Sequence, residues 1–323
     1  MSGLASLVLS GKEIACIDQQ YKRKLQNIVK LPVNSPSSLV HFVAGSLPGT
    51  ALLHLKQVTL FSMICRLPGD PLHVYAQHIL TSSSSPTSWF LQVRDLFLMY
   101  QLPHPLSLLQ YPPEKLSFKK LAKAKVLDYW EDKLRKEAAL LPSLTNFKPQ
   151  FMSLTSPHKI WTTAGNKSHE VAKARIQMLL LSSKYPCAML TSHWGSENDQ
   201  GLCTHPPCKE QMLQESVEHI LLDCPAYTPT RQNLITMCLG KKDPVIHSLV
   251  CKYLFSSNFI QFLLDCSVLP LVVHYAQVHG EGIYRDLFYL SRTWCFALHR
   301  ERMKRLNKWN FRWSWSSPAP SWW

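Results

Sequence analysis

The sequence predicts a mainly α-helical protein, and three observations support that prediction. Glycine is scarce, with 11 residues in 323, whereas proline is common, with 22. Few runs alternate between apolar and polar residues with the period of two that marks a half-buried strand. Apolar residues instead recur at spacings of three and four, the period of an α-helix that buries one face. We therefore expect helices joined by loops in which prolines are frequent.

The expected helices, in chain order, cover residues 10–30, 35–44, 52–65, 71–80, 89–100, 114–140, 168–182, 258–273 and 281–306. The clearest is 114–140, where Phe118, Leu121, Leu127, Trp130 and Leu134 form the predicted apolar face. Residues 81–88 and 103–113 are expected to form loops, and residues 142–163 an irregular linker.

This pattern divides the chain into four parts. We expect a helical region at 1–145, a small Cys3His zinc-binding module at 146–235, and C-terminal amphipathic helices at 236–308. The tail at 309–323 holds five of the ten tryptophans, and we expect it to be disordered. Two interpretations of the tail stay open. Its indoles stack on nucleic-acid bases with Arg312 supplying charge, or it is non-coding sequence translated after a frameshift.

Composition limits the class of protein and of partner. Hydrophobic residues make up 46%, which is typical of a globular chain. Lys and Arg number 35 against 21 Asp and Glu, so the formal net charge is +14. Such an excess favours an anionic partner, most often nucleic acid, although many soluble proteins are basic without one. We find neither a secretory signal nor an apolar stretch of membrane-spanning length, and we expect an intracellular protein, cytoplasmic or nuclear, without a membrane partner.

Four residues have the spacing of zinc ligands. Cys203, Cys208, His219 and Cys224 form the pattern C-x4-C-x10-H-x4-C. Three thiolates and one imidazole are a common ligand set for zinc, and four protein ligands leave no open position, which predicts a structural Zn²⁺ rather than a catalytic one. Pro225 cannot comfortably continue a helix, so we expect Cys224 where that helix unwinds.

Two alternatives to this ligand set stay open. In the first, Cys208 and Cys224 are buried thiols and His219 is a residue on a helix surface. In the second, His205 replaces His219 or Cys203 as the fourth ligand.

The residues around this motif resemble the zinc-binding segment downstream of the reverse transcriptase domain in LINE-type (non-LTR) retrotransposon polyproteins. The resemblance rests on the four proposed ligands and on Lys173-Ala-Arg175, Tyr185-Pro186, Trp194, Glu215, Ala226-Tyr227 and Arg231. Residues 261–266 and 287–300 resemble the C-terminal helices of the same family, and residues 44–48 and 53–55 its post-polymerase connector. The resemblance covers residues 3–308. It implies a region that helps to bind template RNA or target DNA.

We expect no catalytic activity. A reverse transcriptase needs adjacent aspartates to hold two metal ions, and the chain contains no Asp-Asp pair. No phosphate-binding glycine loop or nucleophile motif occurs either. The resemblance then implies a C-terminal fragment, whether a truncated copy, an incomplete gene model or a host-retained remnant. The alternative function is a zinc-stabilised helical scaffold that binds proteins and has no nucleic-acid role.

Two basic helical segments are the predicted nucleic-acid contacts, with binding that is largely electrostatic and nonspecific for RNA or DNA. Residues 115–136 and 281–323 each hold eight basic and three acidic residues, a net charge of +5. We expect Leu287 and Trp294 to pack on the core and the arginines of the last helix to face outward, independent of the zinc site. The predicted contacts are Lys119, Lys120, Lys123, Lys125, Arg285, Arg292, Arg300, Arg302 and Arg305.

Overall fold

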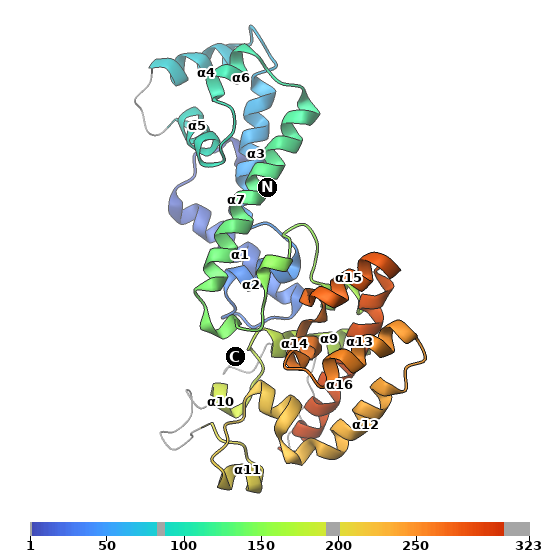
Figure 1. The fold of residues 1–323 in the computed structure, drawn as a ribbon. Helices are drawn as coiled ribbons and strands as arrows, with labels where there is room; N and C mark the ends of the chain where they lie inside the picture. Colours follow the sequence, from blue (N-terminus) through green and yellow to red (C-terminus); the bar gives the residue numbers. More distant parts are fainter. Residues whose placement is uncertain (1, 83–87, 192–200, 307–323) are drawn as a thin grey trace. The chain divides into compact units, whose positions relative to one another are not determined.

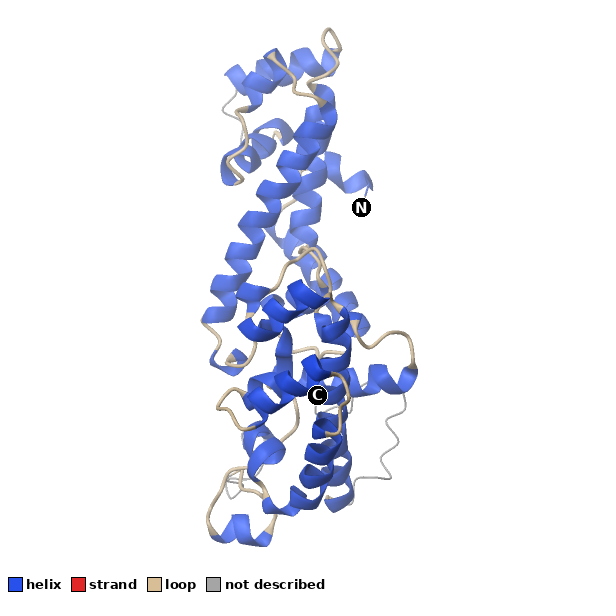
Figure 2. Cartoon of the chain, turned by 45° about the vertical axis from the view of Figure 1, so that its right-hand side comes forward, coloured by secondary structure: helices blue, strands red, loops and turns tan. Residues whose placement is uncertain are grey.

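A computed structural model describes residues 2–82, 88–191 and 201–306, so the predicted Trp-rich tail lies outside the described residues. In the described part the protein is mainly helical and has no strand, which confirms the predicted fold class (Figure 2). None of these helices is by itself long and apolar enough to cross a membrane. Two bent pairs, 37–64 and 259–279, meet that test by length and composition only when each pair is taken together.

The chain forms two compact units, each with its own core. Unit 1 comprises residues 1–28, 36–138 and 153–156, and unit 2 comprises residues 29–35, 139–152 and 157–323. The Cys/His segment and the C-terminal helices therefore belong to the same unit. The domain limits predicted at 145, 235 and 308 stay a prediction.

Unit 1 contains the helices of the first part of the chain (Figure 1). They are η1 (Ser2–Ser6), α1 (Gly11–Val29), α2 (Ser37–Ala44), α3 (Gly49–Ile64), α4 (Pro71–Ser82), α5 (Trp89–Met99), α6 (Pro105–Gln110) and α7 (Lys115–Ala139). Rings from three helices meet in the core, where the centroids of Phe61 and Phe97 lie 5.4 Å apart and those of Phe97 and Phe118 lie 6.1 Å apart. This apolar contact leaves the opposite face of α7 for solvent.

The buried face of α7 differs from the predicted one. The residues buried along the helix recur every four positions and are Phe118, Ala122, Val126, Trp130, Leu134 and Ala138. Leu121, predicted in the apolar face, is 39% exposed, and that part of the prediction is wrong. Spacings of three and four are both compatible with one helix face, and in the structure the row that starts at Phe118, whose ring stacks on that of Phe97, is the buried one.

Unit 2 is built around the long C-terminal helix. Its elements are η2 (Pro142–Leu144), η3 (Pro149–Phe151), α8 (Lys159–Thr162), α9 (Ser168–Leu181), α10 (Ala188–Thr191), α11 (Pro206–Glu210), η5 (His219–Asp223), η6 (Pro225–Tyr227), α12 (Thr228–Leu239), α13 (Pro244–Leu254), α14 (Phe259–Asp265), η7 (Cys266–Val268), α15 (Pro270–His279) and α16 (Gly282–Arg305). Helices α9, α12, α14 and α15 all pack on α16. Leu287 and Trp294 are buried in this core, as predicted.

The helix predicted at 258–273 is broken, and that prediction is wrong. Asp265 has extended backbone angles (φ −156°, ψ 91°), and its side chain accepts hydrogen bonds from the backbone N–H and hydroxyl of Ser267. The backbone of Leu269 is also extended, because a proline disfavours the helical region for the residue that precedes it. Helix α15 then begins at Pro270. The buried Asp265 also accepts a hydrogen bond from Nε2 of His158, at 3.2 Å. The break thus gives α14 a polar link to the start of α8.

Candidate metal centre

A short looped segment presents the first two cysteines. The backbone N–H of Cys203 donates to the carbonyl of Leu213, and the N–H of Leu213 donates to the carbonyl of Cys208, each at 2.9 Å. A third bond, from the N–H of Glu215 to the carbonyl of Gly201, closes the loop. Cys208 lies in α11, whose first residue is a proline preset for helical geometry. These backbone hydrogen bonds therefore fix the positions of Cys203 and Cys208 in the loop.

The other two residues of the motif bracket a single π-helical turn, η5. The backbone N–H of Cys224 donates to the carbonyl of His219 at 2.8 Å, the i to i+5 bond of that geometry. Because this bond joins residues five apart, it places Cys224 next to His219 along the turn. The helix ends there, since Cys224 leaves the helical region (φ −56°, ψ 119°) before Pro225. The expected unwinding at Cys224 is confirmed.

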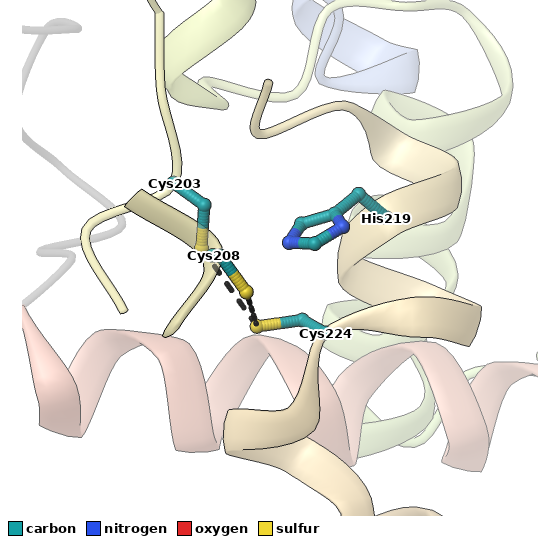
Figure 3. Close-up of side chains that lie close together, drawn as sticks. All are labelled: Cys203, Cys208, His219 and Cys224. Atoms are coloured by element: carbon teal, nitrogen blue, oxygen red, sulfur yellow. Dashed lines mark hydrogen bonds between the residues drawn. The ribbon is translucent and has the colours of Figure 1, made fainter. Parts of the chain in front are cut away.

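Four ligand atoms converge in a buried cluster. One atom from each of Cys203, Cys208, His219 and Cys224 lies within 4.8 Å of the others, and all four residues are buried. The Cys224 sulfur is 3.8 Å from that of Cys203 and 3.9 Å from that of Cys208. A tetrahedral zinc with Zn–S bonds of about 2.3 Å sets sulfurs about 3.8 Å apart. Figure 3 shows the His219 ring facing the three sulfurs.

An orphaned nitrogen supports metal binding independently. Nε2 of His219 is buried and has no hydrogen-bond partner among the described residues. A buried polar atom without a partner is costly, and coordination of a metal ion would satisfy it. Three thiols and one imidazole are also the donor types that zinc prefers. The residues therefore fit a metal ion such as zinc. His205, the alternative ligand, is not part of the cluster.

Burial changes the acid–base chemistry of the cluster. It raises the pKa of the Cys203, Cys208 and Cys224 thiols, and it lowers the pKa of His219. Without a metal, the buried thiols hold their protons and the imidazole is neutral. A metal ion must therefore displace protons from the cysteines, whereas His219 is already in the form that binds metals.

A buried ion pair joins the cluster to α16. Arg302 donates from Nε and Nη2 to the two carboxylate oxygens of Glu215, at 2.9 and 2.7 Å. Oε2 of Glu215 also accepts from the backbone N–H of Ala188, at 2.7 Å. The guanidinium lies over the ring of Tyr185, with its carbon 5.4 Å from the ring centroid. We call the Glu215–Arg302 pair the clasp. Since both side chains are buried, the clasp orders the loop that carries Cys203 and Cys208.

The clasp corrects one prediction. Arg302 and Arg292 were expected to face outward, yet they are only 4% and 2% exposed. Arg292 pairs with Glu170 at 3.3 Å and donates to the Thr163 hydroxyl at 2.8 Å. A guanidinium can be buried where carboxylates and other oxygen acceptors surround it. Those partners are far away in the sequence, so the sequence alone does not reveal them.

The expected independence of the metal site from the last helix is also wrong. Nη2 of Arg305 donates to the carbonyl of Ala226 at 2.7 Å, two residues beyond the ligand Cys224. Nε1 of Trp294 donates to the carbonyl of Leu221, inside η5, at 3.4 Å. Residues far away in sequence thus hold the metal turn from α16. Arg305 itself is exposed, as predicted, and so are Arg285 and Arg300, the remaining predicted contacts on this helix.

The predicted lysines of α7, unlike Arg292 and Arg302, are not buried. Lys119, Lys120 and Lys123 are exposed, and Lys125 is half-buried. No ion pair engages these four lysines or Lys115 within the described part of the chain. Their binding role stays a prediction, and their charges are available for it.

Comparisons with known proteins identify no relative. No family model matches the chain, and neither a curated protein nor a solved structure shows significant similarity to it.

Proposed function

We propose that this protein is a non-catalytic nucleic-acid-binding module that a structural zinc ion holds together. The convergence of four buried ligand atoms within 4.8 Å carries the structural-zinc part of the proposal, because four protein ligands stabilise a fold and leave no open position on the ion for a substrate. Cys203, Cys208, His219 and Cys224 would hold the ion. When bound, the ion supplies a crosslink between the loop at 201–215 and the turn η5. The chain's own contribution is the clasp, which orders that loop against α16.

The proposed nucleic-acid contact is the lysine face of α7, defined by Lys115, Lys119, Lys120, Lys123 and Lys125. Residues 115–125 hold these five lysines and no acidic residue. Lys115, Lys119 and Lys123 are four apart, so they form a stripe about 12 Å long at 1.5 Å per residue. A stripe of that length spans about three phosphates of one strand at 3.4 Å per nucleotide. The resemblance to LINE-type retrotransposon proteins supports the same role, in binding template RNA or target DNA.

The test is the affinity of the purified full chain for a mixed-sequence 20-nucleotide RNA, measured at several salt concentrations. Phosphate contacts release counterions, so the affinity should fall steeply as salt rises, with a log–log slope of about −2 or steeper for three or more contacts. Binding should depend little on sequence. Absence of binding at low salt would reject the nucleic-acid role and favour the zinc-stabilised scaffold that binds proteins.

A further inference from the structure

A groove lies on unit 2 beside the metal turn. Its volume is about 340 Å³, and residues of η5, α12, α14, α16 and the end of α13 line it. Phe259 and Trp294, both buried, contribute aromatic surface, whereas Phe255 is 84% exposed. Small-molecule sites commonly combine such volumes with mostly apolar walls and a few polar groups. The groove therefore has a volume within the range of small-molecule sites, and none of the metal ligands lines it.

Arg231 is the single charged residue among those described as lining the groove. Its Nη2 donates to the carbonyl of the metal ligand Cys224 at 2.7 Å and to the Thr228 hydroxyl at 3.2 Å. Its Nη1 is buried and has no hydrogen-bond partner in the described structure. An unsatisfied buried donor is costly, so an acceptor that reached Nη1 after a small shift of the Arg231 side chain toward the groove would offset that cost. Gln232 and Ser256 add polar groups to the lining.

These features together restrict the ligand. A purely apolar molecule would cover Phe255 and leave the Arg231 donor unsatisfied. An inorganic anion would satisfy the guanidinium and leave the exposed phenyl ring in water. A nucleobase meets both demands, since it offers a flat face to an aromatic ring and acceptor atoms at its edge. A base inside a duplex is already stacked and paired, so only an unstacked base can enter.

We propose that this groove receives one unstacked base of a single-stranded nucleic acid. The base face lies against Phe255, and Arg231 and Gln232 contact its edge. This inference rests on the proposed nucleic-acid function and extends it, because it adds a base contact on unit 2 to the phosphate contacts of α7. The bond from Arg231 to the carbonyl of Cys224 means that the metal turn also positions the groove's guanidinium.

The experiment compares the wild-type full chain with four variants by fluorescence anisotropy, with a labelled 20-nucleotide RNA, a DNA of the same sequence, and the corresponding DNA duplex. Phe255→Ala removes the stacking surface. Phe151→Ala is the matched control, because Phe151 also belongs to unit 2, is 60% exposed and does not line the groove. Phe255→Ala should weaken binding to the single strands by about five- to 150-fold. Its salt slope should stay that of the wild type, since no phosphate contact is lost.

Each outcome of this experiment supports or rejects the proposed base-binding groove. Wild-type affinity of Phe255→Ala for single strands, together with weaker binding by a Lys119→Ala, Lys120→Ala, Lys123→Ala triple variant, rejects the groove and leaves the proposed function standing. Equal weakening of single strands and duplex by Phe255→Ala also rejects it. Absence of all binding by the wild type removes both proposals. Phe255→Trp, which keeps an aromatic face, should restore the affinity, and its failure to do so contradicts stacking.

Discussion

Two helices of this protein carry clusters of positive charge that look alike in sequence and differ in structure. The first half of α7 presents lysines to solvent without acidic partners among the described residues. In the last turn of α16, Arg302 is buried and pairs with Glu215, whereas Lys304 and Arg305 are exposed and share Glu301 at 3.6 Å. Counting charges gives a net of +5 for both segments. Burial and pairing, which the count omits, separate the α7 lysines, which are available for binding, from Arg302, which holds the fold.

The helix dipole deepens the contrast. Positive charge is favourable near a helix C-terminus and unfavourable near an N-terminus. The basic residues of α16 stand at the favourable end. Lys115 stands in the first turn of α7, which has no acidic residue. The carboxylate of Glu114 accepts hydrogen bonds from the backbone N–H groups of Leu116 and Ser117. Its negative charge partly offsets the unfavourable interaction of Lys115 with the helix dipole. The α7 lysines therefore contribute little to stability, which agrees with a role in binding.

The largest effect is expected from removing the metal that α16 helps to hold. Cys208→Ser should abolish metal binding and destabilise unit 2 by several kcal/mol, since the free energy of metal binding contributes to folding. Thermal unfolding followed by circular dichroism, with the metal content of each sample, measures both effects. The control is Cys238→Ser, because Cys238 lies outside the cluster and burial raises its pKa to about 11. Equal metal content in the two variants would contradict the assignment.

The next effect concerns the clasp. Arg302→Ala leaves the Glu215 carboxylate buried without its partner, which should lower the free energy of unfolding by about 3–5 kcal/mol. Urea denaturation measures the change. Arg285→Ala is the matched variant on the same helix, and it should stay within about 0.5 kcal/mol of the wild type because the Arg285 side chain is 74% exposed. Similar small losses in both variants would mean that the clasp adds nothing to the fold.

Substitutions in the lysine face of α7 should weaken RNA binding and leave the fold stable. Replacing Lys119, Lys120 and Lys123 with Ala should reduce the log–log salt slope of RNA binding by about 2 and leave the metal content unchanged. The control is a Lys133→Ala, Lys136→Ala double variant in the second half of α7, where Lys136 is already paired with Asp132 at 2.7 Å. An unchanged slope in the triple variant would show that its lysines are only a solvated face.

The smallest effect tests the dipole argument. Lys115→Glu places a negative charge in the first turn of α7, which should raise the free energy of unfolding by about 0.3–1 kcal/mol. The same change should weaken RNA binding, because it reverses one charge of the lysine face. Urea midpoints and RNA affinities report the two consequences separately. A loss of stability in this variant would show that Lys115 supports the fold of unit 1.

Sequence reasoning succeeded where the determinants are local. The helix of residues 168–182 follows from its own periodicity, and the structure has α9 at Ser168–Leu181. The Cys3His set was also local, since four strong metal donors fall within 22 positions and a proline marks the end of the turn.

Sequence reasoning failed where a residue's partner is distant. Arg302 and Glu215 are 87 positions apart, and nothing in either neighbourhood marks them as a pair. An arginine near the end of an amphipathic helix is usually exposed, so its burial could not be predicted. The groove also escaped notice, because it brings together residues of five separate elements. Among the features that the sequence does not predict, the π-helical turn alone has a local signal, the five-residue spacing from His219 to Cys224.

The central claim is that the buried Cys3His cluster is a metal centre. The most direct measurement is the zinc content of the wild-type chain, purified without chelator and determined by mass spectrometry together with protein concentration. We expect about one zinc per chain, as a closed set of four ligands requires. Well under half an equivalent of zinc, with no other metal ion in its place, would contradict it.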